Sequence, residues 1–190
     1  MPVVAFDWLN FLMQYSEALL RTPDIARNLP PTIVMSGWVW EPGATAEQLA
    51  QAEARLGVRL PPSYRAFLQE SNGAPWEVPP LWSTEDISWL SLHNQWLIDD
   101  WADPDLFLSD DEYLDYSRGQ QPVVRTEDLH AALQIGDWGD DALYILNPHI
   151  VTDDGEWQAW YYSSHLPGFV RYPSFQEMMQ ATYDSFTRLN

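Results

Sequence analysis

Residues 55–75 read RLGVRLPPSYRAFLQESNGAP, and their punctuation predicts the end of one helix, a short connector and a second helix. Gly57 can take the left-handed conformation that closes a helix. Pro61–Pro62 supply a fixed φ and a missing N–H group, which suit the first turn of the second helix, and Asn72-Gly73 ends it. The apolar face of this second helix consists of Tyr64, Phe67 and Leu68.

The preceding residues predict the first helix of the pair. Thr45 and Gln48 have the spacing of a capping box, in which each side chain satisfies a backbone N–H of the first turn. Leu49, Ala52 and Leu56 then recur on one helical face. Because both helices are amphipathic, we expect them to pack on an apolar surface formed further along the chain.

From Leu133 the period of the sequence changes to that of strands. Residues 133–148 (LQIGDWGDDALYILNP) predict a strand, a turn rich in Gly and Asp, and a second strand. Residues 149–163 (HIVTDDGEWQAWYYS) repeat this plan around a hairpin turn at Asp154-Gly155, and Phe169–Tyr172 form one more short strand. Ser174 and Glu177 then cap a closing helix. The order predicts an α+β fold, a mainly antiparallel sheet packed against several helices.

The first 44 residues predict an N-terminal extension, and residues 45–190 the main domain. A helix is expected from Asp7 to Arg21, with Asp7 as its N-cap. The proline-rich residues 22–44 predict an irregular connector with short extended pieces at Ile33–Met35 and Trp38–Trp40. The start has no basic region before its apolar residues and no uninterrupted apolar run, so we expect a cytoplasmic protein without a targeting or membrane-spanning segment.

The charge balance limits the partners. The chain has 28 acidic and 9 basic residues, a formal net charge of -19 at pH 7. Such a charge repels nucleic acid and anionic membranes, so neither is expected as a partner, whereas a basic protein would be attracted. Acidity that only keeps an aromatic-rich protein soluble is the alternative. The absence of cysteine removes disulfides, thiol catalysis and thiolate metal sites.

The most acidic segment is residues 99–116, DDWADPDLFLSDDEYLDY, which contains no basic residue. Such a run often forms only a solvated face. Here aromatic side chains interleave with the carboxylates, a combination suited to docking a basic protein. The predicted partner-binding residues are Asp99, Asp100, Trp101, Asp103, Asp105, Phe107, Asp110, Asp111, Glu112, Tyr113 and Asp115.

No pattern in the sequence predicts catalysis, a cofactor or a metal site. The four histidines, His93, His130, His149 and His165, are scattered without metal-binding spacing. Glu156, Asp137 and His149 are the acid–base candidates, but nothing in their spacing requires them to converge.

Two further patterns have an ordinary structural explanation and a functional alternative. The Asp-rich residues 137–141 suit a hairpin turn better than a cation site, because their spacing differs from that of a calcium loop. Trp157 and Trp160 would point to opposite faces of a strand, which favours core packing over a flat sugar-binding platform.

Residues 47–74, EQLAQAEARLGVRLPPSYRAFLQESNGA, resemble the signature of the SUKH superfamily, also called the Smi/Knr family. Residues 133–148 resemble its strand, G-D turn and strand, and RYPSFQEMM, residues 171–179, its closing helix. The resemblance covers residues 45 to 187. The matching signature positions are Glu53, Leu56, Gly57, Leu60, Pro61, Tyr64, Phe67, Leu68, Asn72 and Gly73.

The resemblance implies helices packed against a mainly antiparallel sheet. Many bacterial members are immunity proteins that neutralise toxins, often nucleases, and fungal relatives act as interaction hubs. We therefore expect a non-catalytic protein-binding module, an immunity protein against a basic toxin. The alternatives are an intracellular regulatory scaffold of the Smi/Knr type and a glycan-binding protein.

Overall fold

The computed structural model describes residues 6–74, 79–103, 109–116, 124–139 and 142–189. Its centre is a five-stranded antiparallel sheet in the order β1-β2-β3-β4-β5, so strands adjacent in sequence are also adjacent in space. The fold is α+β, as predicted. The strands are β1 (Ser88–Trp89), β2 (Leu133–Asp137), β3 (Ala142–Val151), β4 (Trp157–Ser163) and β5 (Phe169–Tyr172).

Strand β3 is longer than the sequence predicted. The aliphatic strand and the residues from His149 onward were expected to be separate, but β3 continues through Pro148 to Val151. Its register against β4 shifts between Asn147 and Val151, and this irregularity accommodates the proline, which has no N–H to donate. Strand β1, only two residues long, was not predicted.

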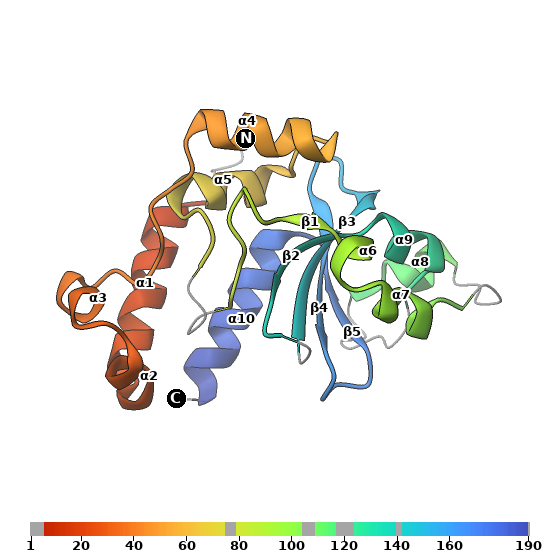
Figure 1. Ribbon diagram of the computed structural model, residues 1–190. Helices are drawn as coiled ribbons and strands as arrows, with labels where there is room; N and C mark the ends of the chain where they lie inside the picture. The colour runs from red at the N-terminus through yellow and green to blue at the C-terminus, as the bar shows by residue number, and fades with distance from the viewer. Residues whose placement is uncertain (1–5, 75–78, 104–108, 117–123, 140–141, 190) are drawn as a thin grey trace.

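One face of the sheet packs against a group of four helices, which share one large core with it. Figure 1 shows α1 and α10 on the same side of the sheet, with α4 lying across the top of α5. Trp8 of α1 packs its ring against Phe67 of α5 and Phe175 of α10, at centroid distances of 5.5 and 5.6 Å. These helices are α1 (Trp8–Arg21), α4 (Ala46–Leu56), α5 (Pro62–Glu70) and α10 (Phe175–Leu189).

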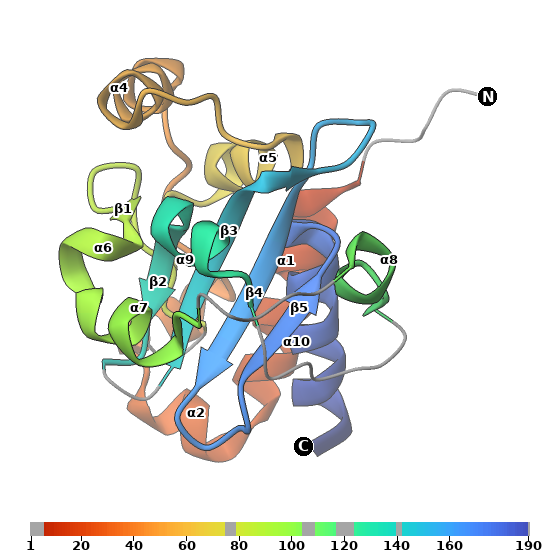
Figure 2. The same ribbon diagram turned by 90° about the vertical axis from the view of Figure 1, so that its right-hand side faces the viewer.

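The opposite face of the sheet carries a second, smaller core under short helices. Leu97 and Ile98 of α7 and Leu129 of α9 pack there with Trp160 of β4. In Figure 2, α6, α7 and α9 lie in front of the sheet, while α8 lies beside β5. The helices on this side are α6 (Leu90–His93), α7 (Gln95–Trp101), α8 (Asp110–Tyr113) and α9 (Thr126–Ala131).

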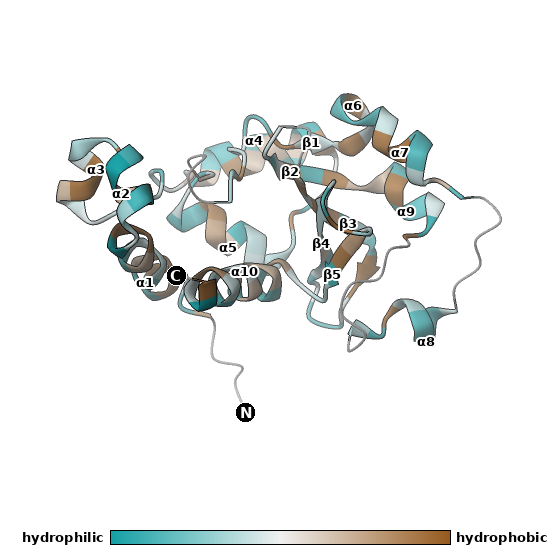
Figure 3. Cartoon of the chain, turned by 90° about the horizontal axis from the view of Figure 1, so that it is seen from below, coloured by the Kyte–Doolittle hydropathy of each residue, from teal (hydrophilic) through white to brown (hydrophobic). Residues whose placement is uncertain are grey.

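The N-terminal connector is helical where extended pieces were predicted. Ile33–Met35 lie inside α3 (Pro31–Ser36), which follows α2 (Pro23–Asn28). Each of these helices begins with a proline, and Gly37 ends α3 with a φ of 72°. Trp38–Trp40 form no strand. Neither α2 nor α3 buries a side chain, and both project at one end of the molecule in Figure 3.

The predicted helix caps of the scaffold are present. Thr45 and Gln48 form the reciprocal capping box of α4, and Gly57 closes that helix with a φ of 72°. Asp7 accepts a hydrogen bond from the backbone N–H of Asn10 at 3.0 Å, and Ser174 accepts one from that of Glu177 at 3.2 Å. None of the helices in the described part of the chain combines the length and apolar character needed to cross a membrane.

Candidate functional site

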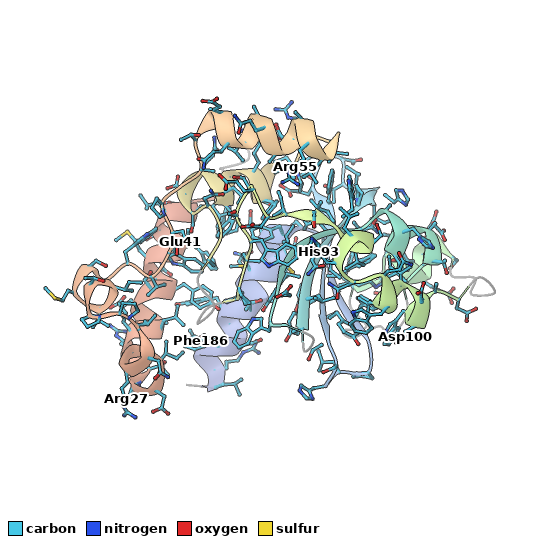
Figure 4. The ribbon with its side chains drawn as sticks, in the orientation of Figure 1. Arg27, Glu41, Arg55, His93, Asp100 and Phe186 are labelled. Carbon is cyan, nitrogen blue, oxygen red and sulfur yellow. The ribbon has the colours of Figure 1, made fainter. Side chains whose placement is uncertain are left out.

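The acidic residues of α7 face solvent. Asp99 and Asp100 are exposed at the end of the helix, and Figure 4 marks Asp100 on its outer side. The next residue, Trp101, is half-buried, with its ring 5.3 Å from Phe169 and 6.0 Å from Tyr162. Trp101 therefore fastens the acidic end of α7 to the second core. Asp103 is exposed just beyond the helix, and the predicted residues Asp105 and Phe107 lie outside the described residues.

Helix α8 presents a second group of carboxylates. Asp110, Asp111 and Glu112 are exposed in its only turn, and Asp115, which follows the helix, is half-buried. Ser109 and Glu112 form a capping box, with the Ser109 Oγ donating to a Glu112 carboxylate oxygen at 2.8 Å. The exposed carboxylates of α7, α8 and Asp103 are defined here as the acidic surface; they belong to Asp99, Asp100, Asp103, Asp110, Asp111 and Glu112.

Tyr113 is fully buried, so it does not offer a partner the aromatic anchor that the sequence predicted. Two guanidinium groups lie over its ring, that of Arg171 at 4.0 Å and that of Arg125 at 4.3 Å from the ring centroid. Arg171 also donates to the Tyr113 carbonyl, and Arg125 donates to Asp110 at 2.6 Å. The ring holds α8 on the protein because the cations attract its π face.

These arginines correct the expectation that the acidic segment lacks a local counter-charge. Burial lowers the pKa of the Arg171 guanidinium, although the neighbouring Tyr113 works against that shift. Below α8, the buried Asp128 lies 3.2 Å from the ring nitrogen Nδ1 of His149. One signal for this arrangement is visible in the sequence, because Arg171 occupies an inward position of a short strand.

A hollow lies at the junction of α6 and α7, next to the end of β2. It is lined by Trp82, Asp86, His93, Asn94, Asp137 and Gly139. The rings of Trp82 and His93 meet edge to face, with their centroids 5.4 Å apart. Sequence reasoning did not predict this site, because Asp137 was assigned to a turn and His93 to an ordinary surface position. No local pattern connects residues that come from such different segments.

The three acid–base candidates do not form a site. Asp137 accepts hydrogen bonds from Gln134 and Gly139 at the β2–β3 turn, whereas His149 of β3 contacts Asp128 of α9. Glu156 lies at the β3–β4 hairpin, in a third place separate from Asp137 and His149. Among the residues in the described ranges, no group of three His, Asp or Glu side chains could hold a metal ion. Asp140 and Asp141 of the candidate cation turn lie outside those ranges.

Glu156 has a structural role instead. One of its carboxylate oxygens accepts from the Ser63 backbone N–H at 2.7 Å, and the other accepts from the Ser63 hydroxyl at 2.6 Å. Helix α5 starts after Pro61, which has no capping side chain, so Glu156 supplies the cap from a distant hairpin. Burial raises the pKa of the Glu156 carboxyl above its usual value, and the bonds from Ser63 partly offset this rise.

Trp157 and Trp160 contribute to two different cores, as the strand alternation predicted. Trp157 packs in the core beneath α5 and α10, whereas Trp160 packs in the core beneath α7 and α9. Both side chains are buried, so they form no sugar-binding platform.

Comparison with protein families gives a match to the SMI1 / KNR4 family (SUKH-1) over residues 43–181, more than half of the chain. The chain belongs to this family. The matched residues run from just before α4 into α10, so they contain the whole sheet and both cores' strands. A search of the curated proteins found no match. Members of the SUKH-1 family are commonly toxin immunity proteins and are generally non-catalytic.

Proposed function

We propose that this SUKH-1 protein is a non-catalytic immunity protein that binds and neutralises a basic protein toxin. The acidic surface is the docking site in this proposal, residues 45–190 form the binding domain, and residues 1–44 form an extension of it. In this proposal one cell carries the genes of the toxin and of this protein. The toxin is neutralised inside that cell, so the protein acts in the cytoplasm. The bound immunity protein covers the active site of the toxin. A nuclease is one kind of toxin that fits this proposal.

The exposure of the carboxylates is the observation that supports the proposal. Asp99, Asp100 and Asp111 are exposed on two separate helices, and no basic side chain of the described residues forms an ion pair with them. With the formal charge of -19, they give this side of the molecule a negative field. Such a field accelerates encounter with a basic protein and opposes encounter with an acidic one.

The test pairs this chain with the C-terminal domain of the large secreted protein that the proposal expects from the neighbouring gene. That domain is expressed in a host with or without this chain, and growth is followed together with complex formation between the purified proteins. We expect arrested growth with the domain alone, and restored growth with a stable one-to-one complex when this chain is present.

Two results would contradict the proposal. A stable complex without restored growth would favour the regulatory scaffold, because a scaffold binds without neutralising. Restored growth with no complex would require the protein to act on the toxin's product or target.

A triple variant, Asp99→Asn, Asp100→Asn and Asp111→Asn, should weaken protection. The control variant Glu41→Gln, Glu70→Gln and Asp153→Asn removes the same charge from other exposed positions and should keep protection.

A further inference from the structure

The hollow beside α7 is preorganised by a chain of buried amide groups. Asn94, at the α6–α7 junction, donates to Gln134 of β2 at 2.7 Å, and Gln134 donates to the Asp137 carboxylate at 3.1 Å. Asn94 and Gln134 are both buried. The other oxygen of Asp137 accepts from the Gly139 N–H at 3.2 Å. The Asp137 carboxylate is therefore held in one orientation before any ligand arrives.

The hollow is acidic because two carboxylates, those of Asp86 and Asp137, line it. Asp86 is exposed and accepts from the Ser83 hydroxyl at 2.5 Å, while Asp137 is half-buried. Within the described part of the chain, no Arg or His side chain forms an ion pair with either residue. Their negative charge is thus directed toward whatever enters the hollow.

Aromatic rings complete the wall. Trp82 is half-buried and holds its ring against the exposed His93, and both line the hollow. Figure 4 places His93 next to the sheet, with Asp100 farther along on α7. Trp96 links the two places, because its indole N–H donates to Asn94 at 2.8 Å while 40% of the residue remains exposed. The hollow is thus joined to the start of α7 by the contact between Trp96 and Asn94.

We propose that this hollow receives an arginine side chain of the basic partner and is a hot spot of the interface. A planar guanidinium can lie against the Trp82 and His93 rings and donate to two separate carboxylates, which a compact ammonium does less well. Interface hot spots are enriched in Trp, Tyr and Arg side chains that fill pockets inside a polar rim. This inference rests on the proposed function for the partner, but the chemistry of the hollow can be tested without that partner.

The first experiment titrates the full-length, ¹⁵N-labelled protein with methylguanidinium and follows its amide and indole signals. We expect saturable shifts at the Trp82 indole and the Gly139 amide. Methylammonium should give smaller shifts at the same concentrations, and uncharged methylurea should give none. The double variant Asp86→Asn, Asp137→Asn should abolish the shifts, while Asp153→Asn should retain them. Signals elsewhere in the spectrum establish that each variant is folded.

Equal shifts with methylurea, or shifts retained in the double variant, would overturn the proposal. His93→Ala provides a second variant in an exposed position, and it should weaken methylguanidinium binding without unfolding the protein. No change in His93→Ala would remove the aromatic part of the proposal.

The second experiment measures the affinity of the partner domain for the same variants. Each of Asp86→Asn and His93→Ala should lower that affinity by about tenfold, because each removes one contact of an interface hot spot. If the partner binds the variants and the native protein equally, the arginine pocket is wrong and the immunity function stands. If no partner binds but methylguanidinium does, the proposed function fails and the hollow remains a cation receptor.

Discussion

The α4–α5 pair and the α7–α8 region use their side chains in opposite ways. In the pair, long apolar faces enter the large core, and Tyr64, Phe67 and Leu68 have no exposed surface. In the α7–α8 region the helices are short, with seven and four residues, and most of their acidic side chains remain in solvent. Few buried side chains, chiefly Leu97, Ile98 and Tyr113, hold these two helices on the protein.

The contrast explains why family membership predicts the scaffold better than the partner. The residues that match the family signature in α4 and α5 are those that a core and its helix ends require. A substitution there changes stability, whatever the protein binds. Asp99, Asp100 and Asp111 contribute little to packing, so solubility or binding explains their placement better than stability does.

The largest expected effect concerns the scaffold. Replacing Phe67 with Ala should lower the free energy of unfolding by roughly 3–5 kcal/mol, because the side chain is fully buried between the rings of Trp8, Tyr64 and Phe175. Urea denaturation followed by tryptophan fluorescence measures this loss. An unchanged unfolding midpoint would show that this face of α5 does not carry the core.

The second prediction concerns the attachment of α8. Tyr113→Leu keeps an apolar side chain but removes the ring that the two guanidinium groups contact, which should cost about 1–2 kcal/mol. Tyr113→Phe keeps the ring and serves as the matched control. Equal loss in both variants, measured by the same denaturation, would show that the hydroxyl rather than the ring stabilises α8.

Helix caps allow the two regions to be compared directly. Thr45→Ala removes a capping box from the long helix α4 and should cost about 1 kcal/mol of unfolding free energy. Ser109→Ala removes the same motif from four-residue α8 and should cost less, because fewer packed residues depend on that cap. Ser109→Ala should instead increase hydrogen exchange of the Glu112 and Tyr113 amides. If Ser109→Ala lowers the unfolding free energy more than Thr45→Ala does, then α8 supports the fold more than α4 does, which contradicts the comparison.

The smallest expected effect depends on pH. The Glu156 carboxyl has a higher pKa in the folded protein than its usual value of 4.5, mainly because it is partly buried. Its protonated form is therefore favoured by folding, and that stabilisation is complete below pH 4.5 and is lost as pH rises through the folded pKa. The unfolding free energy of the native protein minus that of Glu156→Gln should fall as pH rises from 4 to 7. A rising difference would show that the bonds from Ser63 outweigh burial.

The scaffold could be predicted because its signals are local. The Thr45 cap, Gly57, the apolar spacing of α5 and the hairpin turn at Asp154-Gly155 each act within a few residues of sequence. The prediction of an extended piece at Ile33–Met35 was wrong. It relied on β-branched and flexible apolar residues in a proline-rich context, but these residues lie in helix α3. The helix-starting effect of Pro31 decided their conformation.

The surface could be predicted only in part because its geometry depends on contacts distant in sequence. The acidity of residues 99–116 is visible in the sequence, but the burial of Tyr113 requires Arg171, 58 residues away. The cap that Glu156 supplies to Ser63 spans 93 residues. The hollow joins Trp82, His93 and Asp137, which share no motif. Only the fold brings such residues together.

In the proposed function the α7–α8 region binds the partner, while the α4–α5 pair only supports it. The decisive measurement is the association kinetics of the partner domain at rising salt concentration. The triple variant of Asp99, Asp100 and Asp111 should associate more slowly than the native protein and show a weaker salt dependence, with little change in dissociation. The charge-matched variant of Glu41, Glu70 and Asp153 should behave like the native protein. Equal association rates and equal salt dependence for the two triple variants would contradict the claim and place the interface elsewhere.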